Sequence, residues 1–536
     1  METNRELLTR ILNEYDCITV NTVNNDCAEF ELYGLKYAIY MLDSKAFPLV
    51  LAIDHSENYP HFLYNEKEYN GHNYRYICLF ESGTLIEYIH TDEEKIRSCI
   101  SRLIALVELS VSDRIAELQK EFLYYWNRAC PVEGKHANYD YQLFVDNEDS
   151  YQWLEQLHFN ASTIRISKRD RYFNDIEKLA YCDKTPVLYL PIIDPSKLIP
   201  PLPGAPWGAR EILDIVSGVV YQRISTDAYQ EITKTSYSKK EIILVFKLNS
   251  YFFACAVEFS NPGVEKLIVK FESRIVRVTP FRMSRCDFGF LNRQIGNEPI
   301  GSIVSIVGAG SLGSYIASEL IKAGYYHVKI FDPDTYDFAN IFRHRLPYLC
   351  SRYRKSQCLE VELRSIHPEL NISEQSVSIN SANVDLLQSS DIIIIAIGDS
   401  DAELQINAAL KRQGITAPVF HAWLEHDGST SHVVAIRDQK EGCFECLYTD
   451  QNGDLCPNIL NRAPQEEIVY FHNGCGGTRV PYGNKTLLTA TTLLLTALED
   501  KATENRIYSF YDNHIEVSPF PKNERCHCCG IQEQIC

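Results

Sequence analysis

The feature that most constrains the fold is a glycine-rich turn between an apolar run and a helical pattern. The apolar run extends from Ile303 to Val307, a helical pattern follows from Ser314 to Ala323, and the turn contains Gly308, Gly310 and Gly313. A strand, a glycine-rich turn and a helix together place backbone N–H groups and a helix N-terminus where a phosphate binds. The stretch therefore predicts a nucleotide-binding Rossmann unit rather than a plain packed turn.

A second apolar run, from His327 to Phe331, ends in an acidic residue. This residue, Asp332, lies 24 positions beyond Gly308. In Rossmann units an acidic residue at about this distance from the glycines binds the ribose of the nucleotide. A short glycine motif alone occurs by chance, but the strand, the helix and the acid in register favour a nucleotide site.

Length and charge limit the class of protein. The 536 residues exceed one ordinary domain, and a hydrophobic content of 45% is enough for several buried cores. The net charge of −19 argues against a nucleic-acid-binding surface, which would need a basic face. The N-terminus has no signal pattern, and the apolar stretch from Leu487 to Leu498 is too short to span a bilayer. We therefore expect a cytoplasmic protein that binds neither membranes nor nucleic acids.

The sequence pattern divides the chain into three segments. Residues 1–125 show a helix, several strands and another helix, which predicts a small α+β domain with an antiparallel sheet. Residues 126–285 contain strand candidates but no catalytic constellation, and we expect an α+β linker or scaffold domain. Residues 286–536 contain the glycine-rich unit and are expected to form an α/β domain.

Polar residues follow two of the predicted strands in the third segment. Asn340, Arg343 and Lys355 come after the second strand, and Asp399 follows a long apolar strand at 391–397. A dehydrogenase has no need of this group, whereas an enzyme that attacks the α-phosphate of ATP needs cations to offset the triphosphate charge. Such an enzyme also needs a carboxylate to hold Mg²⁺. The residues therefore favour an ATP–Mg²⁺ site over a solvated polar loop.

The run of Gly-x-Gly-x-x-Gly, Asp-x-Asp, Asn-x-x-Arg, Lys and Asp resembles the adenylation domain of ThiF/MoeB-type ubiquitin-activating enzymes. The resemblance implies that Asp332 binds the ATP ribose and that Asn340, Arg343 and Lys355 contact the phosphates. It also implies that Asp399 holds Mg²⁺. Family members usually have Asp-Asn at that position, where this chain has Asp399-Ser400-Asp401, so either aspartate could be the ligand.

A segment upstream of the glycines resembles another part of the same family. Residues Asn292-Arg293-Gln294-Ile295 are similar to a segment whose arginine reaches the nucleotide of the partner subunit. The resemblance therefore implies a homodimer through the adenylation domain, with Arg293 acting across it.

Two pairs of cysteines have the spacing of metal ligands. Cys443 and Cys446 form one Cys-x-x-Cys pair, and Cys526 and Cys529 form another about 80 residues later. Four thiolates are the tetrahedral set that a structural Zn²⁺ prefers. The pairs therefore predict a structural zinc that fixes the C-terminal segment to the domain. Free thiols, or a site that uses a neighbouring residue of the second pair, are the alternatives.

Cys475 is a candidate nucleophile. It lies between glycines in Asn473-Gly-Cys-Gly-Gly-Thr478, which indicates an exposed turn, and Arg479 nearby would favour a thiolate. In activating enzymes a cysteine between the metal-site aspartate and the C-terminus takes the acyl group from the adenylate. The resemblance implies this role for Cys475; an incidental loop thiol or an extra metal ligand is the alternative.

Cys78 is a second candidate nucleophile. The segment Tyr76-Ile-Cys-Leu79, which follows Asn58-Tyr59-Pro60, resembles the active-site region of ubiquitin-conjugating enzymes. The usual His-Pro-Asn tripeptide is missing, with only His72-Asn73 nearby. A buried free thiol is the alternative, since this is a common state of cysteine. An activating domain in the same chain favours the nucleophile.

The whole arrangement resembles the fused conjugating–activating proteins of bacterial CBASS anti-phage operons. The resemblance implies that ATP–Mg²⁺ adenylates the C-terminal carboxylate of a partner protein, which in those relatives is the nucleotidyltransferase encoded alongside. The acyl group would then pass to Cys475, to Cys78 and finally to an amine of a target protein. The alternatives are an activating enzyme for sulfur carriers, a Rossmann oxidoreductase and a non-enzymatic adaptor.

Overall fold

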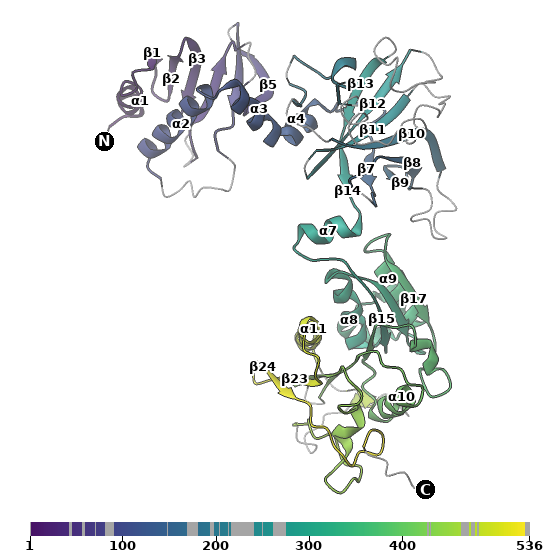
Figure 1. Cartoon of the computed structure of the whole chain (residues 1–536). Coiled ribbons are helices and arrows are strands. Elements are labelled where there is room, and N and C mark those ends of the chain that lie inside the picture. The colour runs from purple at the N-terminus through teal and green to yellow at the C-terminus, as the bar shows by residue number, and fades with distance from the viewer. Residues whose placement is uncertain are drawn as a thin grey trace. The chain divides into compact units, whose positions relative to one another are not determined.

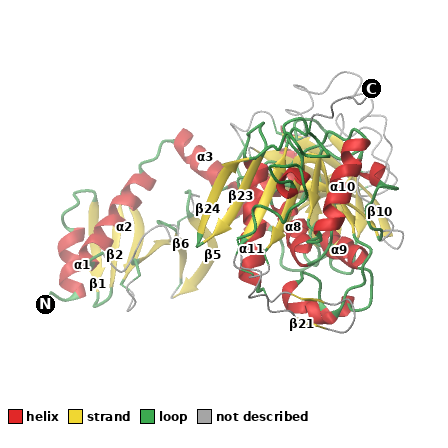
Figure 2. Cartoon of the chain, turned by 90° about the horizontal axis from the view of Figure 1, so that it is seen from below, coloured by secondary structure: helices red, strands yellow, loops and turns green. Residues whose placement is uncertain are grey.

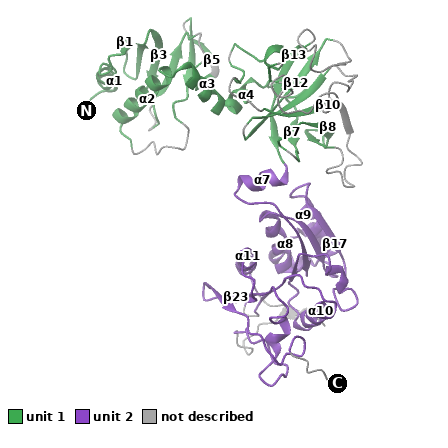
Figure 3. Ribbon diagram, viewed as in Figure 1, with its two compact units in different colours: residues 1–286 green, residues 287–536 purple. Residues whose placement is uncertain are grey.

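The computed structural model shows a chain of two compact units (Figures 1 and 3). The first extends from Met1 to Cys286 and the second from Asp287 to Cys536. The structure describes residues 2–41, 46–55, 59–69, 71–80, 90–146, 148–168, 181–192, 198–202, 204–212, 214–215, 241–248, 250–260, 275–425, 428, 430–462, 471–472, 478–479 and 482–530. Among these residues, no helix is both long and apolar enough to cross a membrane.

The first unit begins with a six-stranded antiparallel sheet and two helices. The sheet order is β1-β2-β3-β4-β6-β5. The strands are β1 (Ile18–Val23), β2 (Cys27–Leu32), β3 (Leu35–Tyr40), β4 (Leu49–Ile53), β5 (Phe62–Tyr69) and β6 (His72–Ile77). Helices α1 (Asn4–Leu12) and α2 (Asp92–Val107) both begin at a threonine capping box, and their apolar faces share one core with the sheet. The helices and the antiparallel sheet agree with the pattern expected for residues 1–125.

An eight-stranded mixed sheet follows in the same unit. Its order is β13-β12-β11-β10-β8-β9-β7-β14. The strands are β7 (Asp140–Leu143), β8 (Gln152–His158), β9 (Thr163–Ser167), β10 (Tyr181–Pro191), β11 (Glu241–Leu248), β12 (Tyr251–Phe259), β13 (Ile275–Phe281) and β14 (Met283–Arg285). Helices α3 (Val111–Lys120) and α4 (Phe122–Ala129) precede it. Phe122 and Trp126 of α4 are buried in the core of this sheet, and the indole of Trp126 donates a hydrogen bond to Phe281 O at 3.3 Å.

The second unit contains another eight-stranded sheet, with a parallel half and an antiparallel half. Its order is β17-β16-β15-β18-β19-β20-β23-β24. The strands are β15 (Ile300–Val307), β16 (Tyr325–Phe331), β17 (Asn371–Gln375), β18 (Ile392–Ile395), β19 (Val419–Leu424), β20 (Ser431–Ile436), β23 (Arg506–Tyr511) and β24 (His514–Pro519). The first five are parallel to one another. The strand order reverses between β15 and β18. Ligands of open α/β sheets bind at such a point, outside the carboxyl ends of the strands.

Helices cover both faces of this sheet (Figure 2). The helices of this unit are α7 (Phe288–Gln294), α8 (Ser311–Lys322), α9 (Lys355–Arg364), α10 (Ser400–Arg412) and α11 (Asn484–Glu499). Alternate residues of β15 point to opposite faces. Val304 and Ile306 pack with α8 and α11, whereas Val307 packs with α10. The α/β class expected for residues 286–536 is confirmed.

Short elements complete the second unit. They are the 3₁₀ segments η3 (Phe338–Arg343), η4 (Tyr348–Cys350), η5 (Val384–Leu387) and η6 (Phe444–Tyr448), and the strands β21 (Phe471–His472) and β22 (Thr478–Arg479).

Candidate active site

The glycine-rich turn joins β15 to α8, and its three glycines have different surroundings. Gly308 has a φ of +101°, and a Cβ there would lie 2.6 Å from Ala396 O in the neighbouring strand segment. A Cβ at Gly313 would overlap the carbonyl oxygen of Gly308. Gly310 is the N-cap of α8, and a Cβ there would meet no atom within 4 Å. Two glycines therefore allow close packing, and the third leaves open space at the positive end of a helix.

Asp332 lies at the end of β16 and holds the turn in place. Its carboxylate accepts hydrogen bonds from Ala309 N at 2.7 Å and from Asp334 N at 2.8 Å. The side chain is buried, and burial raises the pKa of this carboxyl although Lys355 and the two backbone N–H groups act in the opposite direction. The carboxylate is therefore oriented between the glycine turn and the segment that follows β16.

A pocket of about 200 Å³ opens at the carboxyl ends of β15, β16 and β18. It brings together four of the expected site residues: Gly308, Gly310, Asp332 and Lys355. Its remaining lining residues are Val307, Phe331, Pro333, Asp334, Val377, Ser378, Ile379, Ala396, Ile397 and Ala402. The apolar members lie beside polar ones, so the pocket can hold a flat apolar group next to a sugar and a phosphate.

Lys355 is the first residue of α9. Its ammonium group lies 2.7 Å from a carboxylate oxygen of Asp334, and its side chain is 14% exposed. A cation in the first turn is unfavourable to the helix dipole by about 0.3–1 kcal/mol. The ion pair with Asp334 offsets this cost, and it keeps a positive charge on the wall of the pocket.

Asn340 and Arg343 contact each other at the end of η3. The Arg343 guanidinium donates to the Asn340 side-chain oxygen at 2.9 Å and lies 5.3 Å from the ring centre of Tyr482. Both residues are described by the structure, but neither is among those that line the 200 Å³ pocket. The structure therefore places them beyond its edge.

Asp399 caps α10 beyond the end of β18. Its carboxylate accepts a hydrogen bond from Ala402 N at 3.1 Å, and it is exposed, as is Asp401 in the first turn. Arg293 is exposed in the last turn of α7. Asp399, Asp401 and Arg293 are also described residues that do not line the pocket.

Three buried residues that the sequence did not indicate support these loops. His344 accepts a hydrogen bond at Nδ1 from Leu346 N, so its Nε2–H donates to Ala309 O at 2.8 Å. Burial lowers the pKa of His344 to about 4, so the ring is neutral and stays in this tautomer. Glu403 accepts from Gly398 N at 3.1 Å and pairs with His421 at 3.1 Å, which anchors the loop before Asp399. A histidine within the apolar run 419–424 was the available signal for the second pair.

The four cysteines of the two Cys-x-x-Cys pairs form one cluster. The thiol sulfurs of Cys443, Cys446, Cys526 and Cys529 all lie within 4.8 Å of one another. The Cys443–Cys526 and Cys446–Cys529 sulfur distances are 3.8 Å and 3.3 Å. Tetrahedral zinc with about 2.3 Å bonds needs sulfurs about 3.8 Å apart, so the cluster fits zinc. Cys528 is not part of it, and its sulfur accepts a hydrogen bond from the Asn407 amide at 3.4 Å.

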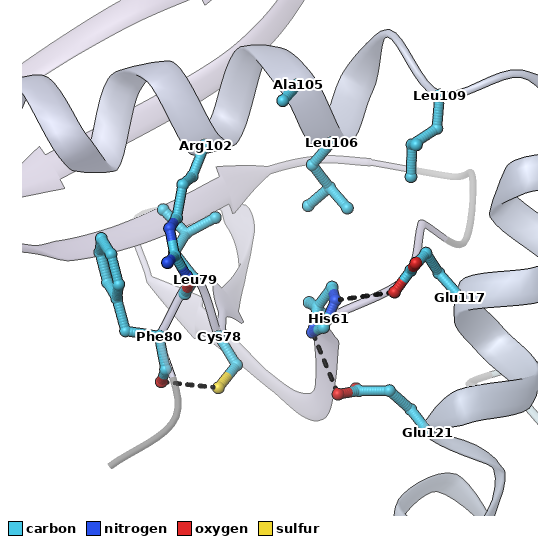
Figure 4. A pocket seen from close by; sticks show the side chains of 10 residues that line it. All are labelled: His61, Cys78, Leu79, Phe80, Arg102, Ala105, Leu106, Leu109, Glu117 and Glu121. Carbon is cyan, nitrogen blue, oxygen red and sulfur yellow. Dashed lines mark hydrogen bonds and ion pairs between the residues drawn. The ribbon is translucent and has the colours of Figure 1, made fainter. Parts of the chain in front are cut away.

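The structure describes only one of the two candidate nucleophiles. Cys475 lies outside the described residues. Cys78 follows β6, is half-buried, and its thiol donates a hydrogen bond to Phe80 O at 3.5 Å. It lines a separate pocket of about 510 Å³ within the first unit (Figure 4).

Comparison with known proteins gives matches over the second unit and beyond it. The model of the ThiF family matches residues 301–528. The chain is 22% identical over 437 residues to the "ATP-dependent ubiquitin transferase-like protein Cap2" of Pseudomonas aeruginosa, covering 78% of this chain and 76% of that protein. The "Sulfur carrier protein ThiS adenylyltransferase" of Bacillus subtilis is 30% identical over 171 residues, which are 30% of this chain and 50% of that protein. The Cap2 protein of Escherichia coli is 29% identical over 194 residues, which are 33% of this chain and 31% of that protein.

Proposed function

Because residues 301–528 form a domain of the ThiF family, we propose that this chain is an adenylyltransferase that activates the C-terminal carboxylate of a partner protein. One carboxylate oxygen attacks the α-phosphorus of ATP, pyrophosphate leaves, and an acyl-adenylate remains. Positioning and charge compensation supply most of the rate of such a reaction.

The pocket at the strand-order reversal is the observation that carries this proposal. It combines an open helix N-terminus at Gly310, a buried carboxylate at Asp332 and the cation of Lys355. These are the three groups that a nucleotide needs for its phosphates, its ribose and its negative charge. We propose that Asn340 and Arg343 also contact the phosphates, although they do not line the pocket itself.

Mg²⁺ would offset the negative charge of the phosphates when bound. Asp399 and Asp401 offer exposed carboxylates beyond β18, within the first turn of α10. We propose Asp399 as the ligand, since Glu403 holds the preceding Gly398 in place.

The acyl group would next move between two thiols. The Cys475 thiolate attacks the acyl carbon, AMP leaves, and a thioester forms; the Cys78 thiolate then takes the acyl group by thioester exchange. An amine of a target protein finally attacks the Cys78 thioester. The match to the Pseudomonas Cap2 protein, which covers 78% of this chain, supports a conjugating step beyond adenylation. By the same similarity we propose a role in CBASS anti-phage defence. The activated protein would then be a nucleotidyltransferase that is encoded alongside this chain.

We further propose a homodimer through the adenylation domain. Large apolar side chains of η3 and η4 are exposed: Phe338 by 60%, Phe342 by 91% and Leu349 by 83%. Exposed apolar residues this close together are typical of an interface. In a dimer Arg293 could reach the nucleotide of the second subunit.

ATP–pyrophosphate exchange tests the adenylation step. Radiolabelled pyrophosphate should enter ATP only when the full-length protein and a protein with the recognised C-terminus are both present. Deleting the last residue of that protein should abolish the exchange. Exchange that occurs without any protein substrate, or that never occurs with a candidate partner, would contradict the proposal.

Activation of a small sulfur carrier is the second candidate. It is favoured by the 30% identity to the Bacillus ThiS adenylyltransferase. It would use the same pocket and the same exchange assay, so the identity of the stimulating protein separates the two candidates.

We propose that the four-cysteine cluster holds a structural zinc. It joins η6 to the chain around residue 526 and offers no open position for a substrate. Cys526→Ser should remove zinc measured by elemental analysis and should lower the melting temperature by about 10 °C, since several kcal/mol of folding energy are lost with the metal. Cys528→Ser is the matched control and should retain both zinc and melting temperature. Equal zinc loss in the two variants would rule out this ligand set.

A further inference from the structure

The pocket that contains Cys78 is built from four parts of the chain (Figure 4). Its polar members are His61 before β5, Cys78 after β6, Arg102 in α2, Glu117 in α3 and Glu121 at the end of α3. The other lining residues are apolar: Leu79, Phe80, Ala105, Leu106 and Leu109. A thiol, an imidazole and two carboxylates therefore face a largely apolar wall in a space of about 510 Å³.

The imidazole of His61 lies between the two carboxylates. Its Nδ1 is 3.2 Å from a Glu121 oxygen, and its Nε2 is 3.9 Å from a Glu117 oxygen. These three side chains are each between 25% and 29% exposed, so the group is reachable from solvent but partly screened from it.

The backbone of His61 is in a conformation that histidine seldom adopts. Its φ is +65°, in the left-handed region, and strain of this kind is often retained at functional sites. The carbonyl oxygen of His61 accepts a hydrogen bond from Cys78 N at 2.9 Å. This bond ties the backbone of His61 to that of Cys78, and both residues line the same pocket.

Arg102, the remaining polar residue of the pocket, contacts Leu79 and Phe80. The Arg102 guanidinium donates to Leu79 O at 2.7 Å and lies 4.3 Å from the ring centre of Phe80. The His61 side of the pocket therefore has two carboxylates and one imidazole, which attract a cation. The apolar wall of Ala105, Leu106 and Leu109 suits an aliphatic stem, so the two halves together match a lysine side chain.

We propose that this pocket receives a primary amine, such as a lysine side chain, as the acceptor of the acyl group on Cys78. Glu117 and Glu121 bind its ammonium form, and His61 accepts the proton that must leave before the nitrogen can attack. The inference rests on the proposed function, because it concerns the last step of that sequence. The amine acceptor is already part of that sequence, and the inference adds the three residues that bind and deprotonate it.

The ammonium gives one proton to His61, which later releases it to water, and the free amine attacks the thioester carbon. A C–N bond forms and the C–S bond breaks. The second proton of the attacking nitrogen goes to the departing thiolate of Cys78, and an amide is left on the acceptor.

The test loads Cys78 without the partner protein. Full-length protein is acetylated with the small thioester S-acetyl-N-acetylcysteamine, and loss of acetyl from the Cys78 peptide is followed by mass spectrometry. Free L-lysine should remove the acetyl group faster than water alone. His61→Gln should slow removal by lysine about tenfold or more, which is the lower range for loss of a general base. In the same variant, the rate of removal by hydroxylamine, which is uncharged at neutral pH, should change by less than about twofold.

The carboxylates are tested by the concentration of lysine needed for half-maximal removal. Glu117→Gln and Glu121→Gln should raise this concentration and leave the reaction with hydroxylamine unchanged. His72→Gln, which alters an exposed histidine on the same sheet, is the control and should behave as the wild type.

Three results would overturn the inference: no acetylation of Cys78, equal slowing of lysine and hydroxylamine in His61→Gln, or removal by water as fast as by lysine. The last would instead indicate a hydrolase. ATP–pyrophosphate exchange measured on the same variants separates these outcomes from failure of the adenylation proposal, because His61 takes no part in that reaction.

Discussion

Replacing Lys355 by alanine is expected to reduce ATP–pyrophosphate exchange about a hundredfold to a thousandfold. The side chain places a positive charge on the wall of the 200 Å³ pocket. In the proposed reaction this charge would stabilise the leaving pyrophosphate. Loss of one preorganised stabilising group of this kind costs about two to three powers of ten in rate. The variant loses both the unfavourable charge at the start of α9 and the ion pair with Asp334 that offsets it, so its melting temperature should stay nearly unchanged.

The matched control is Lys322→Ala. Lys322 also forms an ion pair, with Glu319 in the last turn of α8, but it is not among the residues that line the pocket. Its exchange rate should stay within about twofold of the wild type, as expected for an exposed pair. Exchange by Lys355→Ala within a few-fold of the wild type would mean that this lysine does not face the phosphates.

Alanine at Gly313 is expected to destabilise the fold, whereas alanine at Gly310 is expected to leave its stability unchanged. At Gly313 the new Cβ would overlap the carbonyl oxygen of Gly308, which is backbone and cannot move aside cheaply. Such overpacking costs about 1–3 kcal/mol or more, which exceeds the gain from the better helix propensity of alanine. Urea unfolding of Gly313→Ala should therefore begin at a clearly lower concentration.

Gly310→Ala should fold as the wild type does. Its φ is −72°, and no atom lies within 4 Å of the added Cβ. The methyl group would occupy the space that a phosphate needs at the N-terminus of α8, so ATP binding measured by calorimetry should weaken at least tenfold. If Gly310→Ala binds ATP normally, the phosphates lie elsewhere.

The central part of the second unit could be predicted from the sequence because its signals are local. Apolar runs followed by glycines or acids locate the ends of β15, β16 and β18, and the parallel sheet then brings those ends together. Gly308, Gly310 and Asp332 meet in the pocket for this reason. The cysteine cluster could also be predicted from the sequence, because two Cys-x-x-Cys pairs are typical of structural zinc sites.

The rest depends on contacts between distant segments, which a single sequence does not reveal. His344 reaches Ala309 from 35 positions away, and Glu403 in helix α10 meets His421 in strand β19. In the first unit, Glu117 and Glu121 are far in sequence from His61, and each looks like an ordinary charge on a helix. Asn340 and Arg343 were expected to contact the phosphates. They do not line the pocket, so this role stays a prediction.

The order in which the acyl group passes from Cys475 to Cys78 is tested most directly by mass spectrometry under non-reducing conditions. The full-length protein is incubated with ATP, Mg²⁺ and the partner protein that supports exchange, and the adducts on Cys475 and Cys78 are located by peptide mapping. We predict that Cys78→Ala accumulates the thioester on Cys475. Cys475→Ala should still exchange pyrophosphate but should never load Cys78. A partner thioester on Cys78 in the Cys475→Ala variant would contradict it.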